Sequence, residues 1–150
     1  MAWDPKEPSY FTLRIPLANN MKFMSLNDRY PHWAVKAKFT KQWHQATLYQ
    51  LSRLDGPLPR PLPPCTIRSL LIVQVHRGRD PHNFTATVKP IVDILAAIEK
   101  LPPMERVAAR QFANCWPDDD ANWIDVETPY IEVNRQSTRG IIIRAVPKER

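Results

Sequence analysis

Two short polar segments carry most of the side chains that could do chemistry. Residues 77–83 have the sequence Arg-Gly-Arg-Asp-Pro-His-Asn, and residues 116–120 have the sequence Trp-Pro-Asp-Asp-Asp. Asp80, His82 and the three aspartates are of the types that bind metal ions, and arginines precede the first group. Carboxylates can hold a hard divalent cation, and arginines can hold phosphate. Together the two segments predict metal-assisted phosphodiester chemistry.

The first segment follows a mostly apolar strand, residues 66–76, which we expect to be central and covered on both faces of a sheet. A helical pattern follows it over residues 87–98, and loops of this kind on a rigid scaffold commonly carry function. Lys89 and Asp93 are four residues apart and therefore share one helix face. Pro90 is compatible with this helix if it falls in the first turn.

The N-terminal part predicts one strand and one helix. Residues 10–16 alternate apolar and polar side chains and end on a proline, which is typical of an edge strand. Residues 33–54 have the spacing of an amphipathic helix, with Lys38, Lys41, Gln42 and Gln45 on its outer face. We expect the tryptophans to lie in the core or in site walls rather than to stack on bases. The apolar helix positions are Val35, Phe39, Trp43, Ala46 and Tyr49, and the other tryptophans considered are Trp33, Trp116 and Trp123.

The C-terminal part predicts a short helix followed by two strands. Residues 105–112 fit the helix. Residues 123–127 and 130–133 alternate as a strand around a bulge or edge at Pro129, and residues 139–146 form the final strand, with residues 134–138 as a hairpin connection. The fold class expected is α+β, a single domain over residues 1–150. Its mixed sheet packs against two main helices in the order β-α-β-α-β-β. The proline-rich residues 55–64 form an internal connector, and residues 1–9 and 147–150 are expected to be flexible tails.

Composition and charge favour a globular protein with a polyanionic partner. Hydrophobic residues make up 43% and charged residues 24% of the 150 residues. Residues 22–79 hold ten Lys and Arg against two Asp, a net +8, so the remainder of the +6 chain carries −2. A basic region ahead of an acidic site suits a polyanion, while an ordinary solvated basic surface is the alternative.

With no apolar run long enough for a bilayer and no signal peptide, we expect a cytoplasmic protein. Cys65 and Cys115 are isolated and are expected to be buried or incidental thiols.

The two segments and the intervening helix together resemble the RusA family of Holliday junction resolvases. The family pattern is roughly R-D-x-D-N, then K-x-x-x-D on a helix, then W-x-D-D. The likeness extends over residues 26–146, and the expected order of elements agrees with it. The matching positions are Arg79-Asp80-Pro81-His82-Asn83, Lys89, Asp93 and Trp116-Pro117-Asp118-Asp119, with Leu26-Asn27, Arg29 and His32-Trp33 similar to the family's Asn/Arg/His-Trp region.

The resemblance implies a homodimeric, magnesium-dependent endonuclease that makes paired symmetric nicks in four-way DNA junctions. Such enzymes serve recombination, repair or phage DNA processing, in a bacterial or phage-infected cell. Asp80 and Asp119 would be the main metal ligands, supported by Asp118. Lys89 would lie near the scissile phosphate, and Asp93 would be a further ligand or the partner of Lys89. The expected DNA contacts are Arg29, His32, Lys36, Lys38, Lys41, Arg77, Arg79 and Asn83, and no small-molecule cofactor or membrane is expected.

The sequence departs from the family pattern at His82, where the family has a second aspartate. Imidazole suits Mn²⁺ and other transition metals better than Mg²⁺. His82 therefore predicts one fewer Mg²⁺, a preference for Mn²⁺, or a role in proton transfer or phosphate contact. The chain is also longer between Asn83 and Lys89 and over residues 100–115, so the site assembles either within one chain or across a dimer.

Three other functions stay open from the sequence. The first is a nuclease for flapped or single-stranded DNA. The second is a junction-binding protein that His82 has made catalytically weak or inactive. The third is a domain that binds a partner other than nucleic acid, which would show no salt-sensitive affinity for DNA.

Overall fold

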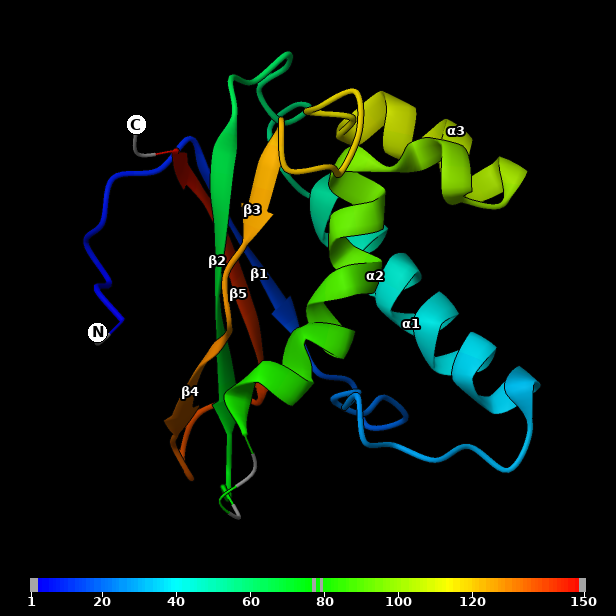
Figure 1. Cartoon of the computed structure of the whole chain (residues 1–150), viewed down its shortest axis with the longest axis vertical. Helices are drawn as coiled ribbons and strands as arrows, with labels where there is room; N and C mark the ends of the chain where they lie inside the picture. The colour runs from blue at the N-terminus through cyan, green and yellow to red at the C-terminus, as the bar shows by residue number, and fades with distance from the viewer. Residues whose placement is uncertain (1–2, 77, 79, 149–150) are drawn as a thin grey trace.

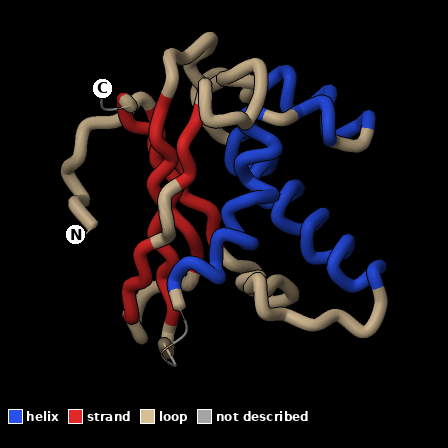
Figure 2. The backbone as a smooth tube through the Cα atoms, in the orientation of Figure 1, coloured by secondary structure: helices blue, strands red, loops and turns tan. Residues whose placement is uncertain are grey.

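Strand β2 lies at the centre of a mixed five-stranded sheet. The computed structural model describes residues 3–76, 78 and 80–148 (Figure 1). Within these residues, three α-helices cover one face of the sheet (Figure 2), which confirms the predicted α+β domain with a mixed sheet. The elements in chain order are β1 (Phe11–Pro16), α1 (Trp33–Ser52), β2 (Cys65–Val73), a 3₁₀ turn (Pro81–Phe84), α2 (Thr85–Ala96), a second 3₁₀ turn (Ile98–Lys100), α3 (Pro103–Phe112), β3 (Ile124–Val126), β4 (Tyr130–Val133) and β5 (Gly140–Pro147).

The strands β3 and β4 share one side of β2, and β5 occupies the other. β3 and β4 both run parallel to β2, β3 beside its first residues and β4 beside its last. β5 runs antiparallel to β2 along most of its length and also pairs with β1. β1 is therefore an edge strand, as its closing Pro16 predicted.

The predicted hairpin between the last two strands is wrong. β4 pairs with β2 in parallel, and β5 pairs with β2 in antiparallel orientation from the opposite side. The connection at residues 134–138 therefore crosses the end of β2 instead of joining neighbouring strands. Gly140 opens β5 in contact with β1, where a Cβ would lie 2.6 Å from the backbone oxygen of Ile15, so no side chain fits.

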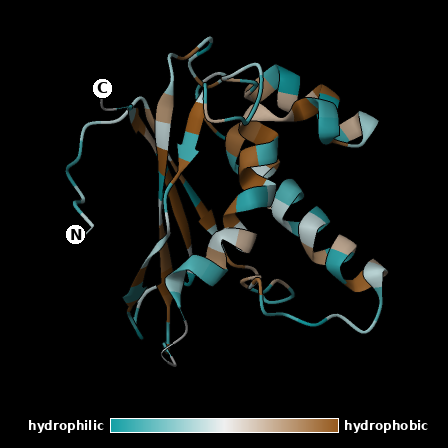
Figure 3. Ribbon diagram, viewed as in Figure 1, coloured by the Kyte–Doolittle hydropathy of each residue, from teal (hydrophilic) through white to brown (hydrophobic). Residues whose placement is uncertain are grey.

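The main core lies between the helices and the inner face of the sheet. Hydrophobic residues are concentrated in the strands and in α2 (Figure 3). Leu71 of β2 and Val88 and Ile91 of α2 are fully buried in this core. Burial of apolar surface at about 25 cal/mol per Å² is the main source of stability here. It holds α2, and with it the predicted site residues, in a fixed position over the sheet.

Helix α1 forms where predicted, but its buried face is shifted. Trp43 is fully buried and Phe39 packs against the core, as expected. Tyr49 is 57% exposed, however, which contradicts its place in the apolar stripe, and Trp33 is 76% exposed, which excludes the core as its position. The side of α1 that packs on α2, α3 and β1 instead carries the buried polar residues His44 and Thr47. No helix in the described part of the chain has both the length and the hydropathy needed to span a membrane.

Helix α2 begins earlier than predicted, directly after the first 3₁₀ turn. Pro90 therefore lies inside the helix and not in its first turn, which corrects the sequence-based expectation. The helix also ends earlier, at Ala96, where the second 3₁₀ turn begins. α3 confirms the short helix predicted at residues 105–112, begins two residues earlier, at Pro103, and makes up a third helix beside the two main ones expected.

The outer face of the sheet is covered in part by residues 3–9, which we expected to form a flexible tail. Arg68 and Arg144 lie opposite each other on β2 and β5, an unfavourable pair of like charges. Glu7 forms ion pairs with both guanidinium groups and so compensates for this repulsion. The ring of Trp3 lies 4.1 Å from the guanidinium carbon of Arg144, a cation–π contact.

The proline-rich connector runs along the end of α3. Backbone hydrogen bonds join Leu58 to Phe112 and Leu62 to Cys115. Cys65 and Cys115 are both buried and form no disulfide. Burial raises the pKa of these thiols to about 11 and about 12, respectively, so both stay protonated at neutral pH.

Candidate functional site

Lys89, Asp93 and Asp119 meet on the exposed side of α2. The Lys89 Nζ lies 3.0 Å from an oxygen of Asp93 and 3.0 Å from an oxygen of Asp119. The first contact joins residues four apart on α2, as the sequence predicted. The second joins α2 to the acidic segment at residues 116–120. Two carboxylates from distant parts of the sequence therefore converge on one cation.

The acidic segment is fixed by its own hydrogen bonds and by Trp116. The Trp116 ring is buried, and its Nε1 donates to the backbone oxygen of Pro63 at 2.9 Å. Asp118 accepts a hydrogen bond from the backbone N–H of Asp119, and Asp120 accepts one from that of Asn122. The three consecutive aspartates thus differ in role, and Asp119 is the one that reaches the lysine.

Lys100 is a fourth member of this group that our sequence interpretation missed. Its Nζ lies 3.1 and 3.2 Å from the two oxygens of Asp119. Lys100 follows Lys89 by eleven residues, close to three helical turns, and positions at that spacing lie near one face. This spacing is the signal that could have identified it, although α2 ends at Ala96 and a 3₁₀ turn supplies the last step. We call Lys89, Asp93, Lys100 and Asp119 the lysine–aspartate cluster.

The cluster strongly favours the ionised form of Asp119. Burial alone would raise the pKa of this carboxyl, but hydrogen bonds from Lys89 and Lys100 outweigh it and lower the pKa to about 2. Burial by itself would likewise lower the pKa of Lys89, whereas its contacts with Asp119 and Asp93 raise it above its ordinary value. Both partners are therefore charged across the physiological pH range.

The low pKa of Asp119 predicts that the cluster loses stability in acid. A carboxyl with a lowered pKa stabilises the fold fully above its unfolded-state pKa of about 3.9, and this contribution disappears as the pH falls through about 2. We expect the difference in free energy of unfolding between the native protein and Asp119→Asn to be largest at neutral pH and to shrink toward pH 2. Urea unfolding at several pH values measures this difference. A difference in the free energy of unfolding that stays the same at every pH would contradict the prediction.

Asp80 and His82 lie at the turn that leads into α2. The Asp80 side chain accepts a hydrogen bond from the backbone N–H of His82 at 3.0 Å and so caps the first 3₁₀ turn. The backbone oxygen of Asn83 accepts a hydrogen bond from Leu26, which ties this turn to the loop before α1. Asp80 and His82 are exposed. The predicted DNA contacts Arg77 and Arg79 lie outside the described residues.

The predicted metal ligands do not form one compact group. Among residues 3–76, 78 and 80–148, no three Asp, Glu, His or Cys side chains gather closely enough to hold a metal ion. Asp93 and Asp119 nevertheless converge on one point, which the Lys89 ammonium occupies. Mg²⁺ is commonly held by one or two carboxylates with waters and substrate phosphates. The oxygen donors of this pair are of the type that Mg²⁺ and Mn²⁺ prefer, but a metal ion held between them would have to displace the Lys89 ammonium.

A pocket joins the cluster to the basic helix α1. It has a volume of about 390 Å³, and Lys36 of α1 lines it together with Lys89 and Asp93 of α2. Lys36, Lys38 and Lys41 are all exposed, and α1 contains no Asp or Glu.

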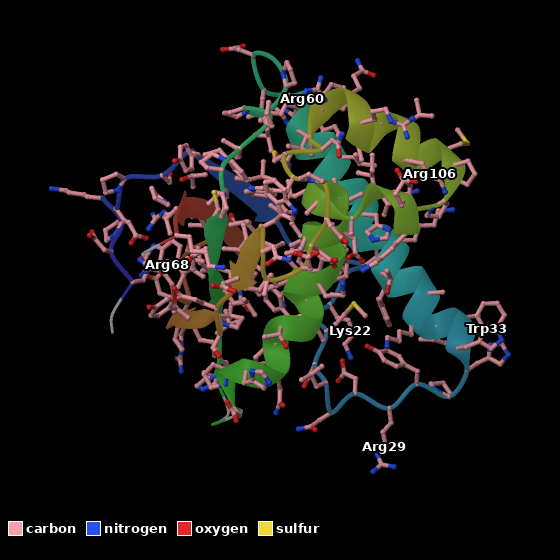
Figure 4. All side chains as sticks on the ribbon, turned by 45° about the horizontal axis from the view of Figure 1, so that its top comes forward. Lys22, Arg29, Trp33, Arg60, Arg68 and Arg106 are labelled. Atoms are coloured by element: carbon pink, nitrogen blue, oxygen red, sulfur yellow. The ribbon has the colours of Figure 1, made fainter. Side chains whose placement is uncertain are left out.

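Two further predicted DNA contacts lie just before or at the start of α1. Arg29 extends from the preceding loop into solvent (Figure 4). His32 instead caps α1, because its Nδ1 accepts a hydrogen bond from the backbone N–H of Ala34 at 3.1 Å. Arg29 is thus free to reach a phosphate, whereas the His32 ring is oriented by the helix end.

Comparison of this chain with models of protein families, with curated proteins and with solved structures finds no match. The resemblance to the RusA family therefore rests on the motif residues alone, and any function has to be argued from the geometry of the lysine–aspartate cluster and its surroundings.

Proposed function

We propose that the protein is a metal-dependent endonuclease that resolves four-way DNA junctions by paired nicks, the activity that the RusA resemblance implies. One observation carries the proposal. Asp93 and Asp119, which are distant in sequence, converge on Lys89 beside a pocket that continues to a helix with three exposed lysines. Carboxylates for a cation and ammonium groups for phosphate are thus adjacent. Because two symmetric cuts need two active sites, we propose a homodimer.

The residues of the cluster suit phosphodiester hydrolysis. A bound Mg²⁺ or Mn²⁺ would supply an activated water and neutralise charge on the phosphate. Asp93 and Asp119 would hold it through their oxygens. Lys89 and Lys100 can each donate to a phosphate oxygen in place of Asp119, and such a donor stabilises the charge that develops as the bond breaks. Lys36, on the far wall of the same pocket, would orient the adjoining phosphate.

Asp80 and His82 would act from the turn before α2. Asp80 has one oxygen engaged in capping the turn, and the exposed imidazole of His82 stands where the family pattern has an aspartate. An imidazole near the cation would favour Mn²⁺ over Mg²⁺. We therefore propose Mg²⁺ as the cofactor, with higher activity in Mn²⁺.

A second candidate is a protein that binds branched DNA without cutting it. The observation that favours it is the pairing within the cluster: both oxygens of Asp119 already contact lysines, and the described residues contain no group of three metal ligands. The basic surface would then be the functional part, and the cluster would only join α2 to the acidic segment.

A nicking assay separates these candidates. The substrates are a synthetic four-way junction, a flap, a single strand and a linear duplex, each with Mg²⁺, Mn²⁺ or EDTA. We expect paired nicks confined to the junction, faster in Mn²⁺ and absent in EDTA. Cuts in the flap or single strand would change the substrate class. Tight junction binding without cuts in either metal would support the second candidate, and no salt-sensitive DNA affinity would exclude both.

A further inference from the structure

An apolar groove lies between α1 and the start of α3, outside the lysine–aspartate cluster. Its volume is about 850 Å³, a size suited to a small organic group or a nucleoside. Trp33, Ala37 and Thr40 form the α1 wall, and residues 102–105 form the opposite wall. We call it the Trp33 groove. Trp33 and Met104 are 76% and 87% exposed, and the Trp33 ring, whose centroid lies 5.3 Å from that of the His32 ring, is largely open to solvent.

The rim of the Trp33 groove is positively charged. Lys36 and Lys41 line it and are exposed. Its one carboxylate, Glu105, is bound to the His44 Nδ1 at 2.8 Å, and the Glu105 side chain is largely buried. An occupant of the groove therefore meets an apolar wall and two free ammonium groups. A flat apolar group that carries negative charge beside it has the complementary chemistry.

The groove adjoins the pocket of the proposed catalytic site. Lys36 and Thr40 line both hollows, so these two side chains form the ridge between them. On the far side of this ridge lie Lys89 and Asp93. A nucleic acid strand with one phosphate at Lys89 could therefore cross the ridge into the Trp33 groove.

We propose that the Trp33 groove binds an unpaired nucleobase of a DNA strand, stacked on the Trp33 indole, with the adjacent phosphates on Lys36 and Lys41. This inference rests on the proposed function and deepens it, because it assigns the enzyme a contact with a nucleotide that is unpaired at the branch point of the junction. Aromatic side chains among lysines are the usual platform for single strands, since every base has a face that can stack. Figure 4 shows Trp33 at the N-terminal end of α1, on the same side of the molecule as Arg29.

The charge on the rim favours DNA over the other occupants of an apolar groove. A second copy of this chain would bring its own lysines to Lys36 and Lys41 if the same face were used in a symmetric contact. That contact places like charges together. A peptide would need both acidic and aromatic residues to match the groove, whereas each nucleotide carries both groups.

The test measures binding of short single strands in EDTA, where no cleavage interferes. The probes are an eight-nucleotide thymidine oligonucleotide and an abasic strand with the same number of phosphates. The native protein is expected to bind the thymidine strand about 10-fold more tightly than the abasic one, the scale of one stacked base. Trp33→Ala should remove this difference, and Trp33→Phe should restore part of it.

The matched control is Tyr49→Ala, which removes another exposed aromatic ring from α1 outside the groove. It should bind both strands as the native protein does, with an unchanged thermal midpoint for both alanine variants. Equal affinity of the native protein for the two strands, or a base preference that survives in Trp33→Ala, would overturn the proposal. The proposal would also be overturned if Trp33 became less accessible to a fluorescence quencher as the protein concentration rises without DNA, because a second copy would then fill the groove. A base preference lost in Trp33→Ala, in a protein that nicks no substrate, would support the groove while rejecting the nuclease.

Discussion

Asp119→Asn is expected to abolish nicking of a four-way junction in both Mg²⁺ and Mn²⁺. The substitution keeps the size of the side chain but removes the charge that holds Lys89, Lys100 and, in the proposed mechanism, the metal ion. Removal of one group that stabilises transition-state charge typically costs about 10²–10³ in rate. We therefore expect a loss of at least about 100-fold, measured as the single-turnover nicking rate.

Two controls make this result specific: the affinity of Asp119→Asn for the junction, and the activity of the neighbouring variant Asp120→Asn. Asp119→Asn releases two lysines and removes a negative charge, so affinity for the junction in EDTA should stay the same or increase. Asp120→Asn makes the same change one residue along, where the side chain caps a turn through the backbone N–H of Asn122. It should keep most of the activity. Normal nicking by Asp119→Asn would remove Asp119 from the catalytic site, while equal loss in both variants would indicate damage to the segment as a whole.

Trp116→Ala is expected to destabilise the fold strongly. The ring is 1% exposed, contacts the ring of Phe11 in β1 and donates a hydrogen bond to Pro63. Truncation of a buried Trp to Ala typically costs about 3–5 kcal/mol, a large part of the roughly 5–15 kcal/mol by which domains are stable. Urea unfolding followed by far-ultraviolet circular dichroism measures the change without relying on tryptophan fluorescence.

A comparison with Trp116→Phe separates packing from the hydrogen bond. Phenylalanine fills most of the space but cannot donate to Pro63, so its cost should be clearly smaller than that of alanine. Because Trp116 precedes Asp119 by three residues, Trp116→Ala should also weaken nicking at temperatures where the protein is still folded. A loss of less than about 1 kcal/mol in the free energy of unfolding of Trp116→Ala would show that neighbouring core side chains move into the space left by the ring.

The elements of the fold were predictable because they depend on local patterns. The alternation in residues 10–16 and the helical spacing in residues 33–54 predicted β1 and α1 at nearly the observed bounds. The pairing partners of the strands were harder to predict. The short connection at residues 134–138 suggested a hairpin, but β4 and β5 each pair with the distant strand β2 instead of with each other. β2 pairs with β4 on one side and with β5 on the other, so the backbone hydrogen bonds of both its edges are satisfied within the sheet.

The burial of side chains on α1 shows the same limit. Tyr49 fits the apolar spacing of the helix, yet it is 57% exposed because the neighbouring elements cover a different face. A helical pattern identifies an apolar stripe but does not show how far the rest of the domain extends along it.

The candidate site was predicted in part. The contact between Lys89 and Asp93 follows from helix geometry alone, whereas the contact with Asp119 depends on how residues 97–118 return to α2. The family resemblance pointed to Asp119, and no local pattern could have done so. Whether Asp80 and His82 join the cluster when DNA and metal bind stays a prediction.

The position of β5 between β1 and β2 also governs when the domain can fold during synthesis. β1 and β2 leave the ribosome early, but neither pairs with the other, and the strand that links them is the last of the strands in the described residues. Contacts between such distant residues make folding slow, because a long loop must close before they form. Until β5 emerges, the apolar residues of β2 and the open side of β1 remain without their partner. We expect helices α1 and α2, which emerge before β5, to limit the exposure of these strands in the nascent chain.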